Sequence, residues 1–153
     1  MTREFRRRWQ HVRGLTREFV EEMPDDCLDN RPARHFASIR EQAVHLVECQ
    51  GVYQLAFRGE KVDFGRKPEF APDADDAESL LAAFAVRDEE LDTLLGELSV
   101  RSFKIDWFGN RIGFWEYASV LLQHEALHHG QWAVHARLGG WQPPDGWIVN
   151  WGL

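Results

Sequence analysis

Seven histidines are the residues of this sequence best suited to chemistry, and two of them are spaced to act together. His124 and His128 are four residues apart, so on an α-helix their side chains lie about 40° apart around the axis and one turn apart along it. Both imidazoles can therefore reach a single metal ion. The alternative is a pair of interior histidines that hydrogen-bond to each other or to a neighbouring carboxylate.

A metal ion needs a third ligand, and His45 is the best candidate. It lies near the middle of a second expected helix, between Glu41 and Cys49, and an antiparallel or diagonal neighbour would bring it level with the pair. Taken alone, His45 would be interpreted as a core histidine. As a partner of His124 and His128 it completes a predicted metal site.

The other histidines are weaker candidates. His135 lies about 10 Å along the helix from His128, too far for the same ion. His129 is rotated by about 100° from its neighbour and is expected to face another helix or solvent. His11 and His35 have no partner at a ligand spacing.

The segment 124–128 also satisfies the short H-E-x-x-H pattern of zinc proteases, in which the glutamate, here Glu125, is the general base. The extended pattern requires a glycine three residues and a histidine six residues after the second histidine. Gly130 and His135 instead follow His128 by two and seven residues. A one-residue offset rotates a side chain by about 100° on a helix, so the protease alternative lacks its third ligand.

Apolar side chains recur at helical spacing in four segments, and the helices that these segments form must position the histidines. The first helix is closed by Pro24, the second begins with the capping box of Ser38 and Glu41, and the fourth stops at a Gly-Gly pair. The expected ranges are about 5–23, 39–57, from 75–78 to 96–99, and 114–138.

The connections complete the expected architecture. Residues 59–74 predict a long crossover loop, 103–110 a short hairpin or extended excursion, and 141–151 an irregular aromatic tail that packs back or against a second subunit. The sequence therefore predicts a single all-α domain over 1–153, an up-down four-helix bundle with a long crossover loop.

The composition of the chain argues against nucleic-acid-binding and membrane-spanning classes of protein. The net charge of -7 gives no overall attraction to nucleic acid or an anionic membrane, and no apolar stretch approaches the roughly 18 residues of a membrane span. A basic patch near the start is interpreted as the solvated face of the first helix; it comprises Arg3, Arg6, Arg7, Arg8 and Arg13. Two cysteines imply no disulfide framework, so we expect a cytoplasmic protein that binds neither nucleic acid nor membrane.

The segments 38–46, 122–131 and 138–144 together resemble the DinB-like (DinB/YfiT) superfamily of metal-dependent enzymes, and the similarity extends over essentially the whole chain. The resemblance implies a four-helix bundle, often dimeric, that holds nickel or zinc through His45, His124 and His128. Members with known activity are largely transferases or isomerases that use a low-molecular-weight thiol such as mycothiol or bacillithiol. Some hydrolases have been proposed.

Three neutral imidazoles leave a divalent ion its charge and an open position, as in catalytic sites. Glu48 and Glu125 are candidates to orient the imidazoles, Cys49 to approach the ion, and Gln131 to line the pocket; each is otherwise an ordinary helix residue. We expect a homodimeric thiol S-transferase or hydrolase that acts on a small molecule. The alternative is a non-catalytic bundle that binds a metal or a small molecule. The aromatic tail could cover the pocket as a lid, pack against the helices or form part of a dimer interface.

Overall fold

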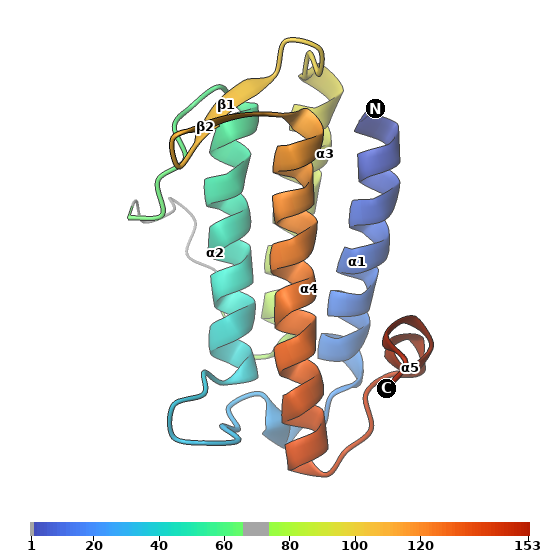
Figure 1. Ribbon diagram of the computed structural model, residues 1–153. Coiled ribbons are helices and arrows are strands. Elements are labelled where there is room, and N and C mark those ends of the chain that lie inside the picture. Colours follow the sequence, from blue (N-terminus) through green and yellow to red (C-terminus); the bar gives the residue numbers. More distant parts are fainter. Residues whose placement is uncertain (1, 66–73) are drawn as a thin grey trace.

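The computed structural model describes residues 2–65 and 74–153, and these residues are mostly helical (Figure 1). The elements, in chain order, are α1 (Thr2–Glu22), a short 3-10 helix η1 (Asp25–Cys27), α2 (Ile39–Phe57), α3 (Ala77–Glu97), β1 (Lys104–Trp107), β2 (Asn110–Gly113), α4 (Phe114–Gly139) and α5 (Asp145–Trp151). The four long helices coincide closely with the predicted ranges.

Local sequence signals set the ends of these helices. Before α2, the Ser38 hydroxyl accepts a hydrogen bond from the Glu41 amide, and the Glu41 carboxylate accepts one from the Ser38 amide, at 3.2 and 2.8 Å. This reciprocal capping satisfies two amides that have no partner within the helix. Gly140 ends α4 in the left-handed conformation with φ 75°, which glycine adopts without steric cost.

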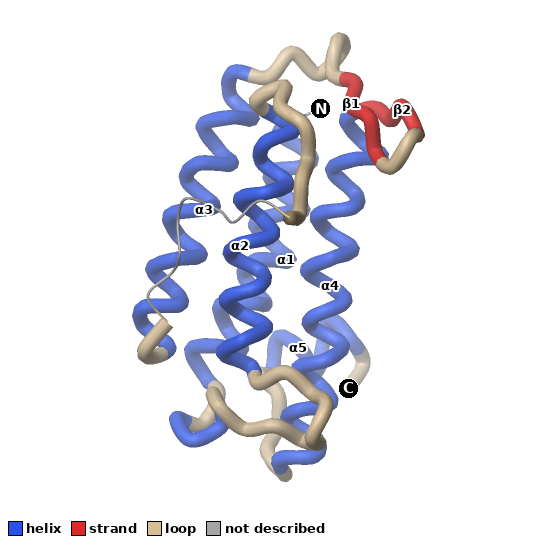
Figure 2. Tube along the Cα trace, turned by 90° about the vertical axis from the view of Figure 1, so that its left-hand side faces the viewer, coloured by secondary structure: helices blue, strands red, loops and turns tan. Residues whose placement is uncertain are grey.

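The long helices lie side by side, with α1 and α2 each packed against both α3 and α4 (Figures 1 and 2). Helices α2 and α3 run in the same direction, so their connection has to pass from one end of the molecule to the other. This is the predicted crossover; its residues 66–73 lie outside the described part of the chain.

The predicted extended excursion is a two-stranded antiparallel hairpin at one end of the molecule. Lys104 pairs with Gly113 and Trp107 with Asn110. Phe108 and Gly109 form the turn with φ of 49° and 83°, in the left-handed region that two-residue hairpin turns require. The hairpin leads directly into α4 and therefore fixes where that helix begins.

Buried apolar side chains form two clusters, and polar side chains are buried between them. One cluster includes Phe19, Leu46 and Trp132, and the other includes Phe5, Tyr53 and Tyr117. These side chains and the half-buried Asp88 come from all four long helices and are joined by hydrogen bonds and ion pairs; the buried ones are Arg13, Thr16, Gln50 and Glu125.

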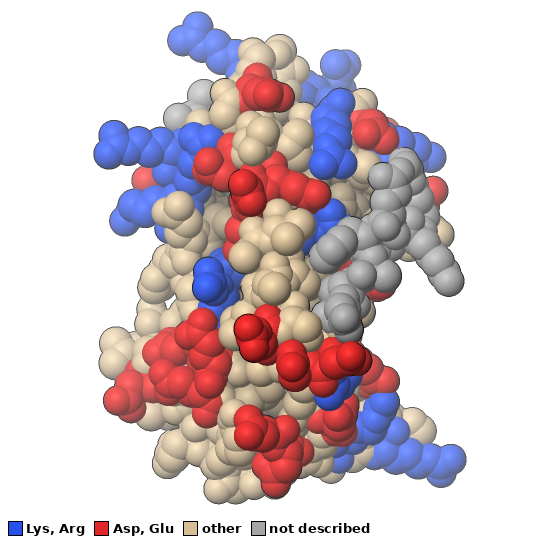
Figure 3. All heavy atoms as spheres, turned by 180° about the vertical axis from the view of Figure 1, so that it is seen from behind, with Lys and Arg blue, Asp and Glu red and all other residues tan. Residues whose placement is uncertain are grey.

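Arg13 corrects the interpretation of the N-terminal basic patch. Its side chain is not solvated: only 2% of the residue is exposed, and its guanidinium pairs with Glu125 at 2.9 Å. Arg3, Arg7 and Arg8 are exposed as expected. The face turned away from the viewer in Figure 1 carries clusters of Asp and Glu among its Lys and Arg, not a continuous basic surface (Figure 3).

The aromatic tail differs from the irregular segment predicted, because residues 145–151 form α5, which packs against α1. Trp147 is fully buried: its indole N–H donates to the Leu15 carbonyl at 2.7 Å, and its ring lies parallel to that of Trp132. The tail therefore packs back onto the helices, one of the alternatives that the sequence left open. Within the described residues, no helix is long and apolar enough to cross a membrane.

Candidate metal centre

Helices α2 and α4 bring the three predicted ligands together. The ring centroids of His45 and His124 are 5.2 Å apart, those of His45 and His128 5.3 Å, and those of His124 and His128 5.0 Å. His124 and His128 occupy successive turns of α4, and His45 faces them from α2. The imidazoles thus form one group although some eighty residues separate the two helices in sequence.

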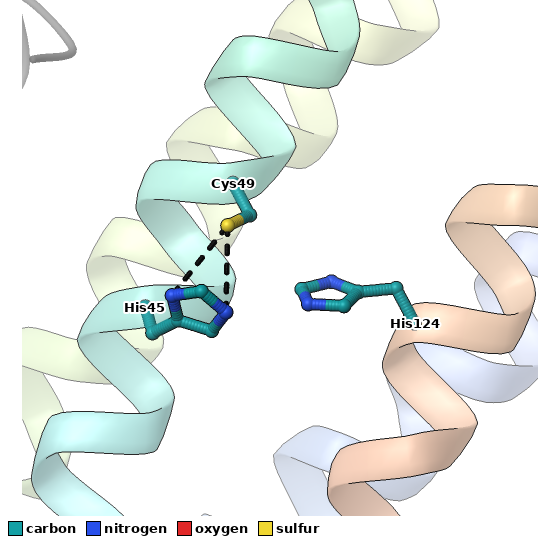
Figure 4. A group of neighbouring side chains, drawn as sticks. All are labelled: His45, Cys49 and His124. Carbon is teal, nitrogen blue, oxygen red and sulfur yellow. Dashed lines mark hydrogen bonds between the residues drawn. The ribbon is translucent and has the colours of Figure 1, made fainter. Parts of the chain in front are cut away.

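Cys49 lies in the same group, one turn after His45 (Figure 4). Its Sγ is 3.5 Å from both ring nitrogens of His45. One ligand atom from each of His45, Cys49 and His124 lies within 4.8 Å of the other two, so these three residues could hold a metal ion. His128, the third ligand predicted from the sequence, does not belong to this set, and Cys49 takes its place. Burial, with a smaller contribution from the charge of Glu48, raises the pKa of the Cys49 thiol to about 11.

The group lies at the edge of the helical core and not inside it. His45 is exposed, which excludes the alternative of a core histidine for this residue; His124 is half-buried and His128 is 6% exposed. A ligand arriving from solvent can therefore reach the imidazoles from the side of His45.

Burial and mutual repulsion keep the α4 imidazoles neutral. Burial is the main cause that lowers the pKa of His124 to about 4, and the nearby His45 adds to it. The pKa of His128 is also lowered to about 4, by burial and then by His124 and His45, against a hydrogen bond with Gln131. Near pH 7 both rings are in the neutral form that binds metal ions.

Aromatic side chains border the group on the side of the hairpin. The Tyr53 ring is 5.5 Å from that of His124, 5.3 Å from Phe64 and 6.1 Å from Trp107. Tyr53 was not among the predicted site residues, yet it follows Cys49 by four residues and His45 by eight, on the same face of the helix.

Gln42 is a second residue that the sequence analysis missed. It precedes His45 by three residues and is 3% exposed, and its Oε1 lies 3.1 Å from His128 Nδ1. Since an amide is no preferred metal ligand, only the one-turn spacing from His45 could have indicated it.

Glu125 lies away from the histidine group, in the buried polar layer. It is 2% exposed, pairs with Arg13 at 2.9 Å and accepts a hydrogen bond from the Thr16 hydroxyl. These partners are on α1, so Glu125 cannot orient an imidazole of the group or act as a general base there. The H-E-x-x-H alternative therefore loses its catalytic glutamate.

The remaining candidates are spread around the group. Gln131 is half-buried and follows His128 by three residues on α4. Glu48 is half-buried, and within the described residues it makes no hydrogen bond or ion pair with the three imidazoles. His129 is buried against Thr16 of α1, with 2.8 Å between Thr16 Oγ1 and His129 Nε2, as expected for a histidine on another face.

The donor set suits a divalent transition metal. Imidazole nitrogens alone, or nitrogens with one thiolate, are the ligands that zinc, nickel and related ions prefer over carboxylate and carbonyl oxygens. All four donors lie on regular helices, in two pairs one turn apart, and the helices hold their backbones at fixed separations.

A mostly helical protein with three histidines and one cysteine grouped between two helices is a candidate metalloprotein. Residues 1–146 of the 153 match the DinB family, and the chain belongs to this family. No curated protein matches the sequence.

Proposed function

We propose that this DinB family protein binds one divalent transition metal ion, nickel or zinc, through His45, His124 and His128 on an up-down four-helix bundle. We further propose that it is a metal-dependent enzyme that transfers a low-molecular-weight thiol to a small molecule or hydrolyses one. The observation that carries the proposal is the convergence of three imidazole rings, with centroids 5.0 to 5.3 Å apart, from two helices.

The chemistry requires an open position and a route to it. A divalent ion held by three neutral imidazoles keeps its charge and lowers the pKa of a bound thiol or water, giving a nucleophile near neutral pH. The exposed His45 leaves the group accessible to a substrate. Trp107, which is half-buried next to the ring of Tyr53, offers apolar surface near the group against which a hydrophobic part of that substrate can pack.

Metal analysis of protein purified without a histidine tag tests the metal site. We expect close to one nickel or zinc ion per chain in the wild type and strong loss in each of His45→Ala, His124→Ala and His128→Ala. His35→Ala is the matched control, because His35 is exposed and outside the group. Circular dichroism checks that each variant keeps its helices.

The proposal fails if the wild type holds no metal after incubation with nickel, zinc and manganese, or if His35→Ala loses as much metal as the other variants. Metal-loaded protein is then assayed for thiol transfer and hydrolysis with electrophilic and ester substrates. A loaded protein without either activity would favour the non-catalytic alternative, a bundle that binds a metal or a small molecule.

The oligomeric state and compartment complete the proposal. We propose a homodimer, supported by apolar side chains exposed on the outer face of α4, namely Leu127, Val134 and Leu138. Light scattering of the purified protein tests it. The two cysteines are free and buried, which agrees with the proposed cytoplasmic location.

A further inference from the structure

Gln42 connects the candidate metal centre to a second buried histidine and to the loop before α2. Its Nε2 donates to the Ala37 carbonyl at 3.1 Å and lies 3.1 Å from His135 Nε2. Its Oε1 lies 3.1 Å from His128 Nδ1. One buried side chain therefore contacts two histidines of α4 and the backbone that leads into α2.

The Ala37 carbonyl determines which way the Gln42 amide points. A carbonyl oxygen only accepts hydrogen bonds, so the amide atom facing it must be the nitrogen. The two amide hydrogens are then directed to Ala37 and to His135, and the amide oxygen is left facing His128. The reverse orientation would place two oxygens against each other in a buried site.

This orientation dictates the tautomer of His128. An amide oxygen has no hydrogen to donate, so Nδ1 of a neutral His128 must carry the proton for a hydrogen bond to form. The unprotonated nitrogen is then Nε2, on the side of the ring away from Gln42. Imidazole binds a metal ion only through an unprotonated nitrogen.

We propose that Gln42 is a positioning residue that holds the proton of His128 on Nδ1 and so keeps Nε2 free to bind the metal ion. The inference rests on the proposed function, because it assumes that His128 is a ligand. Free neutral histidine favours the proton on Nε2, the tautomer that cannot offer this nitrogen. Gln42 opposes that preference and fixes the ring before the ion arrives.

The variants Gln42→Met and Gln42→Glu test this role. Methionine has a similar volume to glutamine but no strong acceptor, whereas a glutamate carboxyl that carries its proton on the oxygen facing Ala37 can still accept from His128 Nδ1. Gln54→Met is the matched control: Gln54 is also fully buried on α2, and its amide donates to the Arg87 carbonyl at 2.7 Å, away from the histidines.

Two measurements are made on each protein. The first is ¹⁵N NMR of histidine-labelled, metal-free protein, which distinguishes the two tautomers; signals missing from a His128→Asn variant assign His128. The second is zinc affinity by competition with a chelating dye. We expect the Nδ1–H tautomer in the wild type, in Gln42→Glu and in Gln54→Met, and the Nε2–H tautomer in Gln42→Met.

We expect zinc affinity to fall by about 10- to 100-fold in Gln42→Met, with most of it retained in Gln42→Glu and Gln54→Met. An unchanged tautomer or unchanged affinity in Gln42→Met would overturn the inference, as would an equal loss in Gln54→Met. Failure of the wild type to bind zinc would refute the metal site itself. The metal-free spectra separate these cases, because they report on Gln42 without any metal.

Discussion

Cys49 and His128 both lie near His45 and His124, and a metal ion can recruit either as its next ligand. The thiol is 3.5 Å from the His45 nitrogens, whereas the His128 ring is 5.3 Å from that of His45, centroid to centroid. Coordination by cysteine requires a thiolate, and burial beside Glu48 raises the pKa of Cys49 to about 11. His128 is already neutral near pH 7 and needs to lose no proton.

We therefore expect the three histidines to hold the ion without Cys49. In a Cys49→Ser variant the metal stoichiometry should stay near one per chain and the affinity within about threefold of the wild type, well below the loss typical of a partner that orients a ligand. The measurement is metal analysis together with the absorption spectrum of cobalt-substituted protein. A sulfur-to-cobalt charge-transfer band in the wild type that vanishes in Cys49→Ser would show instead that Cys49 is a ligand.

The residues near the candidate metal centre that carry metal-binding side chains could be predicted from the sequence. Residues that contribute through shape or hydrogen bonding could not. The i, i+4 spacing indicated His124 and His128, because helical geometry alone places them on one face. For Gln42 the spacing from His45 shows only a shared helix face, and its proposed role depends on a loop carbonyl that only the folded chain brings near. Glu125 was assigned to the wrong group, although the 100° rotation that excluded His129 applies to it as well.

At the scale of the helices, the Arg13 side chain joins all four long elements. Its guanidinium pairs with Glu125 of α4, lies 3.3 Å from Asp88 of α3 and donates to Gln50 of α2 at 2.7 Å. A buried charge is costly without a partner, so these contacts favour one relative placement of the helices over shifted alternatives. Glu125 directly follows His124, so this ion pair also fixes the part of α4 that carries the two histidines.

Removing one partner of this buried pair should destabilise the protein strongly. In Glu125→Ala we expect the free energy of unfolding to fall by about 3–5 kcal/mol, because Arg13 would remain buried without its closest charge. Urea denaturation followed by circular dichroism measures the change. The Glu4→Ala variant is the control, since the pairs of Glu4 with Arg7 and Arg8 are on the surface and should contribute little to stability.

The double variant Arg13→Met with Glu125→Leu separates a missing partner from simple loss of packing. Replacing both charges with apolar side chains should recover a large part of the stability lost in Glu125→Ala. If the double variant were as unstable as the sum of the two single changes, the unpaired charge would not be the cause.

Element boundaries were predictable wherever a local signal marks them, as with Pro24, the Ser38 cap and the left-handed Gly140. α5 was not predicted, because seven residues that include Gly146 are too short and too flexible to form a stable helix alone. Its order depends on Trp147, whose ring is buried against Phe19 and His129 at centroid distances of 4.5 and 4.7 Å. Such tertiary packing has no counterpart in the local sequence.

For the molecule as a whole, buried neutral histidines make stability depend on pH. Burial is the main cause that lowers the pKa of His129 to about 3, with smaller contributions from Arg13 and His128. In the unfolded chain the same side chain titrates near its ordinary pKa of about 6.5. Between these values the unfolded state binds a proton that the folded state does not.

The contribution of His129 to the free energy of unfolding is therefore fully present above about pH 6.5. It is lost progressively as the pH falls toward about 3, and the free energy of unfolding then changes by at most about 1.4 kcal/mol per pH unit.

We expect metal-free wild type to lose stability between about pH 7 and pH 5, measured by urea denaturation at several pH values. His129→Gln, which can still hydrogen-bond to Thr16, should show a smaller slope over the same range. Glu125, whose carboxyl pKa burial raises, acts in the opposite direction but is present in both proteins. Parallel pH profiles for the two proteins would contradict the assignment of this acid sensitivity to His129.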